Sequence, residues 1–320
     1  MSAAACLLLY SFIAVVLAPR LLLRLAHTGV TPRLGVLAWV AALGSVVASW
    51  AAAAGFLLGE VVAGWNRPGR SLIDACFAQL RAVATGRYGF AVQLGVIALA
   101  AMTAVTLAVL VARLGRSLLR ARVGTHDHAR MARIAGRRVE GLEAIVLDAP
   151  QRAAYCVPGR PNAIVITSAA LAALDRRQLE AVLSHERAHL AGRHHLLLAV
   201  TRGLGAALPR LELFTAGATE VARLLEMCAD DAAARRHGAP TVLRAMLALS
   251  SAAPIPHGAL GATGVDVLAR AERLAAPPRR VRRLRARLLL CGFAVLVALG
   301  PVVTGGLAAA GLSFCDPMNG

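Results

Sequence analysis

The chain has 320 residues, of which 58% are hydrophobic, and it carries a net charge of +18 at pH 7. A soluble protein of this length needs fewer hydrophobic residues to form its core. The composition therefore argues against a soluble enzyme and favours a membrane protein. The charge does not indicate direct binding of nucleic acid, because the arginines gather at the ends of apolar segments and only 4% of the residues are aromatic.

Four apolar segments are predicted to cross a membrane: Ala3 to Leu17, Leu34 to Leu58, Phe90 to Val111 and Leu288 to Ala310. The last three approach or exceed the roughly 20 apolar residues that a bilayer requires. The first is shorter, but it has no basic region before it and no small-residue cleavage site after Pro19. We therefore interpret it as a retained anchor and not as a signal peptide.

The arginines next to these segments predict how the chain is oriented. Most of them lie between the first two spans, directly after the third and directly before the fourth: Arg20, Arg24, Arg33, Arg113, Arg116, Arg120, Arg122, Arg279, Arg280, Arg282, Arg283, Arg285 and Arg287. The positive-inside rule places these loops in the cytoplasm of a multi-pass cell-membrane protein, with both termini outside. The outer side then includes Cys76 and Cys315, which could form a disulfide there.

Between the third and fourth spans lies the one polar segment large enough to fold by itself. We therefore divide the chain into a membrane region at residues 1–113, a cytoplasmic α+β domain at 114–286, and a last span with a short external tail at 287–320. The expected fold class is a mainly α membrane protein with four transmembrane helices.

The first part of this domain is expected to contain a basic helix that runs to about Val139. Extended segments are predicted at Glu143 to Leu147 and at Asn162 to Thr167, the second because it contains a run of β-branched residues.

Two helices are predicted next. Asp175 and Gln178 have the spacing of a capping box and open the first helix. The second helix runs from Thr215 to His237 and ends at Gly238. Beyond it, a loop-rich return to the membrane is predicted from Pro254, Pro256, Pro277 and Pro278.

The first of these helices contains the pattern His-Glu-x-x-His at residues 185–189. Histidines four residues apart project from one face of a helix, so His185 and His189 can hold one zinc ion, with Glu186 beside it. Zinc lowers the pKa of a bound water, and a glutamate that accepts its proton allows attack on a peptide carbonyl. No cysteine pair has the CxxC spacing of a structural zinc site, which argues against that alternative.

The identity of the third ligand distinguishes two classes of peptidase. Gly192 and His195 complete the longer pattern of the metzincins, in which a third histidine binds the metal. The apolar residues directly after His195 continue a helix, however, and we interpret His194 and His195 as polar residues near a helix end. The competing ligand is Glu226 in the segment EMCAD, with Asp230 one turn further on to hold a ligand histidine. A solvated acidic patch at these positions is the remaining alternative.

The segments LEAVLSHERAHLAGRHH, EMCADDAA and RPNAIVITSAAL, with three spans before and one after, resemble the membrane-embedded gluzincins of the BlaR/MecR type, to which HtpX-type peptidases are related. The resemblance implies a zinc ion bound by His185, His189 and Glu226, with Glu186 as the base and Asp230 in support. It also implies an edge strand that pairs with an extended substrate, formed by Asn162, Ala163, Ile164, Val165, Ile166 and Thr167.

The function implied by the resemblance is that of a membrane-bound zinc endopeptidase with a cytoplasmic active site. Its protein substrate would be a DNA-binding transcriptional repressor. The sensor members of the family carry a penicillin-binding domain after the fourth span, whereas this sequence ends at Gly320, so we do not expect it to sense β-lactams directly. Two alternatives remain, namely a quality-control protease of the HtpX type and a non-catalytic membrane scaffold.

Overall fold

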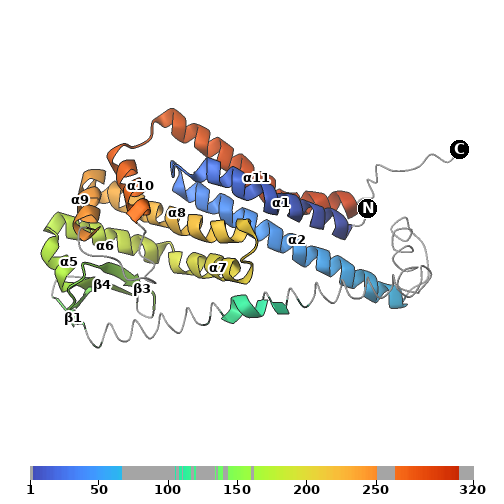
Figure 1. The fold of residues 1–320 in the computed structure, drawn as a ribbon, viewed down its shortest axis with the longest axis horizontal. Coiled ribbons are helices and arrows are strands. Elements are labelled where there is room, and N and C mark those ends of the chain that lie inside the picture. Colours follow the sequence, from blue (N-terminus) through green and yellow to red (C-terminus); the bar gives the residue numbers. More distant parts are fainter. Residues whose placement is uncertain are drawn as a thin grey trace.

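The structure is a computed structural model that describes residues 3–66, 136–139, 143–159, 162–250 and 264–309, with short pieces between 105 and 134. Most of the predicted span Phe90–Val111 lies outside the described residues, as do Cys76, Cys315, Pro254 and Pro256. The elements named below keep the labels of Figure 1.

Three of the described helices are long and apolar enough to cross a membrane: α1 (Ala3–Ala26), α2 (Pro32–Asn66) and α11 (Arg280–Ala309). They lie side by side in Figure 1. Their outward faces carry large apolar side chains, such as Phe12 with 66% and Leu296 with 70% exposed, as expected for contact with lipid. These helices confirm three of the four predicted spans.

Polar side chains connect the three helices inside this bundle. The Tyr10 hydroxyl donates to the carbonyl oxygen of Val297 at 2.8 Å, and the Trp50 indole donates to the Ser11 hydroxyl at 3.0 Å. The first helix is longer than predicted because Pro19 lies inside it and does not end it. A proline is tolerated in such a helix when neighbouring helices pack around it, and Pro19 is buried.

The sheet has four short strands: β1 (Arg137–Arg138), β2 (Ile145–Leu147), β3 (Ala154–Val157) and β4 (Ala163–Thr167). Their order is β1-β2-β4-β3, with β4 parallel to β2 and antiparallel to β3. Two expectations are therefore wrong. The predicted helix does not reach Val139, because β1 occupies residues 137–138, and residues 162–167 do not form an edge strand, because β3 covers the outer side of β4.

Helices form most of the rest of the domain. They are α5 (Ser168–Ala173), α6 (Arg176–Ala191), α7 (His194–Ala207), α8 (Glu212–His237), α9 (Ala239–Ser250) and α10 (Gly264–Ala275). The capping box at Asp175 and Gln178 is present at the start of α6. The segment predicted as a loop-rich return to the membrane is partly helical instead, because it contains α10, whereas Pro277 and Pro278 lie outside any helix between α10 and α11. Before it, α9 begins directly after Gly238 with Pro240 in its first turn, where proline suits a helix.

The helix α8 lies along α2, and α7 packs against α8, as Figure 1 shows. The rings of Trp50 and Phe214 are 5.9 Å apart, and a single hydrophobic core joins residues of the membrane bundle, such as Trp39 and Leu22, to Phe214 and Leu224 of α8. A second core lies between the sheet, α6 and α9. The helix α8 is therefore fixed to the membrane bundle on one side and to α6 on the other.

The contact between α8 and α2 predicts the effect of a larger side chain at Gly217. A Cβ atom there would lie 3.2 Å from Trp39 and 3.4 Å from Leu43, both buried. We expect Gly217→Leu to lower the free energy of unfolding by roughly 1–3 kcal/mol, because the packed neighbours cannot move aside without strain. Thermal unfolding of the purified protein in detergent measures this. The control is Gly44→Leu on α2, where a Cβ meets no atom within 4 Å. Equal unfolding temperatures for the two variants would contradict the packing described.

Candidate metal centre

Three side chains from two helices converge at one point. His185 and His189 lie one turn apart on α6, and their Nε2 atoms are 3.1 Å apart. Glu226 on α8 places Oε2 3.5 Å from Nε2 of His185 and Oε1 3.4 Å from Nε2 of His189. Among the described residues, these three form the one group of histidine, cysteine, aspartate or glutamate side chains close enough to hold a metal ion. His195 is not part of this group.

The turn between α6 and α7 explains why His195 stays away from the centre. The first helix ends at Ala191, Arg193 adopts a left-handed conformation with φ of 49°, and α7 begins at His194. The buried His194 ring turns back instead, with its Nδ1 2.9 Å from Nδ1 of His189. Gly192 makes this possible, because a Cβ atom there would lie 2.4 Å from Nε2 of His194.

A buried charge network holds the other two ligands. Nδ1 of His185 is 3.1 Å from Oδ1 of Asp230, whose side chain is 1% exposed. Arg270 on α10 donates to both oxygens of Asp230, at 2.7 and 2.8 Å, and lies 3.1 Å from Glu226 Oε2. A solvated acidic patch is therefore wrong for this position, because Asp230 is buried and paired.

Sequence reasoning missed two residues of the centre. Arg270 lies in the segment for which the sequence predicts a loop, and nothing distinguishes it there from the many other arginines. His194 was interpreted as a polar residue near a helix end, whereas it contacts a member of the metal-binding group through the ring nitrogen that faces away from the centre. Such a contact fixes the ring and leaves the other nitrogen free for a metal ion.

The electrostatics of the centre suit a divalent cation. Burial raises the pKa of Glu226, but its hydrogen bond to His185 and the charges of His185 and Arg270 outweigh this effect and lower the pKa to about 2. Hydrogen bonds to Arg270 and His185 likewise hold the pKa of Asp230 below its usual range, against the effect of burial. Two carboxylates thus remain charged beside Arg270 and His185.

The two histidines and Glu226 together provide the kinds of ligand atom that zinc prefers. Burial lowers the pKa of His189 to about 4, so this imidazole is neutral at pH 7, as a metal ligand must be. Burial also lowers the pKa of His185, but hydrogen bonds to Asp230 and Glu226 raise it to about 10 overall. A metal ion would replace this proton at Nε2, while Asp230 keeps the hydrogen at Nδ1. Two imidazole nitrogens and one carboxylate oxygen are the protein ligands of a catalytic zinc site.

Glu186 lies beside the centre and under the edge strand. It is 9% exposed, and burial raises its pKa to about 7, with the charge of Glu226 acting in the same direction. The charge of His185 and a hydrogen bond from the backbone N–H of Cys156 in β3 oppose this rise. A carboxyl group that titrates near pH 7 can both accept and return a proton.

Two histidines on one helix turn, a glutamate from a later helix and a buried glutamate beside them define a zinc metallopeptidase of the gluzincin class. The model of peptidase family M48 matches residues 125–287. The match covers just over half of the 320 residues, and the chain therefore belongs to peptidase family M48. No curated protein and no solved structure matches it. Zinc is typical of this family, and the three candidate spans make the enzyme membrane-associated.

The geometry predicts which substitutions remove the metal. Glu226→Ala should purify with little zinc, because two histidines alone hold the ion too weakly, whereas His195→Ala should retain about one zinc per chain. Asp230→Ala should fall between them, with zinc affinity reduced about 10 to 100-fold because the His185 ring loses its partner. Zinc content of the purified variants measures this. An empty His195 variant beside a fully loaded Glu226 variant would overturn the assignment.

A second prediction concerns Gly192 and His194. Gly192→Ala should weaken zinc binding about 10-fold, because the new methyl group displaces the His194 ring from His189. Its φ of −77° suits alanine, so backbone strain contributes nothing to this effect. His194→Ala should weaken binding by a similar factor. Because both act through one contact, the double variant should bind zinc as tightly as His194→Ala alone. Additive losses would show that Gly192 acts in some other way.

Proposed function

We propose that the protein is a membrane-bound endopeptidase whose active site faces the cytoplasm and which cleaves a DNA-binding transcriptional repressor. The orientation is supported by arginines at the protease end of the spans. Arg33 lies at the start of α2, and six arginines lie at or before the first turns of α11: Arg279, Arg280, Arg282, Arg283, Arg285 and Arg287. Such residues favour the cytoplasmic side. The repressor as substrate rests on the resemblance to the BlaR/MecR type.

The side chains of the centre divide the work of peptide hydrolysis. When bound, zinc polarises the substrate carbonyl and lowers the pKa of water. His185, His189 and Glu226 would hold the ion in place, while Asp230 and Arg270 fix the orientation of His185 and Glu226. A carboxylate oxygen of Glu186 accepts a proton as the water oxygen bonds to the peptide carbon. The same carboxyl group returns a proton to the leaving nitrogen as the C–N bond breaks.

We infer that the substrate backbone pairs with β3 and not with residues 162–167. This strand is at the edge of the sheet, and it lies against α6, which carries Glu186. In an antiparallel pair, successive residues direct their backbone N–H and C=O groups alternately toward the partner strand and away from it. The N–H of Cys156 points away from β4 toward Glu186, so the backbone groups of Ala154, two residues earlier, also lie on the outer edge of β3. An extended peptide added there would bring its carbonyl group past Glu186. The position of β3 beside Glu186 is the observation that best supports an endopeptidase activity.

The catalytic role is tested by Glu186→Gln. This variant should keep its zinc and its fold, because the amide has the same shape and Glu186 is not among the three converging ligand side chains. It should lose proteolysis by several orders of magnitude, because the amide cannot accept a proton. Glu180→Gln, an exposed position on the same helix, is the matched control. Cleavage at the wild-type rate by the Glu186 variant would rule out the proposed base.

The substrate is identified in cells that carry the Glu186→Gln variant. Quantitative proteomics should find one DNA-binding protein that accumulates in its uncleaved form, compared with cells that carry Glu180→Gln. Accumulation of many membrane proteins would instead support a quality-control protease, which would use the same metal centre on a broad set of substrates.

A further inference from the structure

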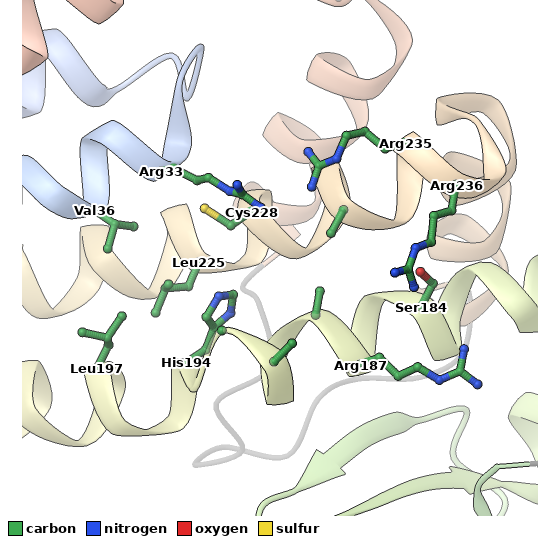
Figure 2. Close-up of a pocket in the computed structure, with 14 residues that line it drawn as sticks. Arg33, Val36, Ser184, Arg187, His194, Leu197, Leu225, Cys228, Arg235 and Arg236 are labelled. Carbon is green, nitrogen blue, oxygen red and sulfur yellow. The ribbon is translucent and has the colours of Figure 1, made fainter.

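A cavity lies beside the metal centre, between α2, α6, α7 and α8. It has a volume of about 850 Å³ and is lined by 14 residues, all of which are drawn in Figure 2. None of the three metal-binding side chains lines it. His194 lines the cavity and also contacts His189 of the metal centre through its ring nitrogen.

The two ends of this cavity differ in chemistry. Val36, Leu197 and Leu225 form one end, whereas Arg235 and Arg236 lie at the other, as Figure 2 shows. Arg33 and Arg187 add two more guanidinium groups to the lining. No lining residue is acidic. A cavity that is apolar at one end and cationic at the other fits an amphiphilic anion.

The charge at the cationic end is largely uncompensated. Arg187 pairs with Glu143 at 2.8 Å. In the described part of the chain no carboxylate forms an ion pair with Arg33, Arg235 or Arg236. Arg33, Arg235 and Arg236 are exposed, so water weakens their mutual repulsion, but an anion between them meets guanidinium groups that have no carboxylate partner in the described part of the chain. Arginine also presents its N–H groups in a fork that matches the oxygen atoms of a phosphate.

The cavity lies at the level where the chain enters the membrane. Arg33 is the second residue of α2, whose segment Pro32–Phe56 is a candidate span, and Val36 lies one turn further along it. The apolar end therefore lies on the membrane side of the arginines. A ligand with its phosphate at the arginines would direct its hydrocarbon part toward the bilayer.

We propose that this cavity binds an anionic phospholipid of the leaflet next to the protease domain. The phosphate lies between Arg33, Arg235 and Arg236, and the start of one acyl chain lies along Val36, Leu197 and Leu225. The volume is in the range of small-molecule sites, which suits a headgroup and the first part of a chain. Free phosphate would use the same guanidinium groups but would leave the apolar end without a partner.

Lipid binding can be measured apart from proteolysis. The full-length Glu186→Gln protein is reconstituted in phosphatidylcholine vesicles with and without phosphatidylglycerol, and the phosphatidylglycerol that remains bound after purification is quantified by mass spectrometry. Replacing both Arg235 and Arg236 by glutamine should weaken the preference for phosphatidylglycerol roughly 30-fold, because each arginine near a membrane contributes about 1 kcal/mol. The matched control replaces Arg176 and Arg177, two adjacent exposed arginines at the start of α6, by glutamine.

The control should retain phosphatidylglycerol like the parent protein. Equal retention by the Arg235/Arg236 variant and the control would overturn the proposal. A further arm adds inorganic phosphate to the phosphatidylglycerol vesicles. Persistence of the bound lipid supports a site for the whole lipid. Loss of phosphatidylglycerol only at the arginine side chains, seen as competition by phosphate, would still place the lipid headgroup in the cavity. Phosphate bound by the parent protein and not by the Arg235/Arg236 variant, with no phosphatidylglycerol retained by either, would show that the cavity binds the free ion and would reject the lipid. Because the protein used is inactive by design, none of these results depends on the proposed substrate.

Discussion

The position of α8 between α2 and α6 is the constraint on which the metal centre depends. One face of this helix packs on the membrane bundle through Phe214 and Leu224, and the same helix supplies Glu226 and Asp230 to the histidines of α6. Neither helix holds a metal ion alone, because α6 provides two ligands and α8 one. The distance between the axes of α6 and α8 therefore decides whether the three ligand side chains can reach one metal ion. Apolar packing on two sides of α8 keeps this distance fixed.

The charges in the centre depend on this packing as well. Asp230 and Arg270 are both almost fully buried, at 1% and 7% exposed, and burying a charge is unfavourable unless a partner with good geometry is present. The two parallel hydrogen bonds between them provide this partner, and the third guanidinium nitrogen reaches Glu226. Removal of one member leaves the others charged and without compensation in a region of low dielectric, which costs several kcal/mol. Three elements far apart in the sequence, α6, α8 and α10, are thereby held in one arrangement.

Local signals in the sequence predicted the elements that carry the metal ligands. The spacing of His185 and His189 places them on one helix face, the capping box at Asp175 defines where that helix begins, and the acidic pair Glu226 and Asp230 has the same one-turn spacing on α8. These features depend on neighbours within a few residues. The apolar length of the spans is equally local, and three of the four predicted spans are present among the described residues.

What the sequence did not predict depends on contacts between distant segments. The order of strands in the sheet is decided by pairing, so the short β3 could not be recognised as the edge, and residues 162–167 were assigned that place instead. Arg270 and His194 become distinctive only when folding brings them to Asp230 and His189. The sequence also predicted no helix directly after Gly238, whereas α9 begins there, because Pro240 lies in its first turn and proline suits a first turn as well as a loop.

The shared core has a consequence for how this enzyme can be dissected. Phe214 and Leu213 are fully buried, and their neighbours include Trp39 and Leu43 of α2, which belong to the first 66 residues of the chain. A fragment cut from 114 to 286 would present these side chains to water as a continuous apolar surface, and large exposed surfaces of this kind lead to aggregation. Mutations in the membrane helices and mutations in the protease domain therefore affect the stability of one folding unit. A chimera that takes either part from a related protein would have to keep the packing between α2 and α8.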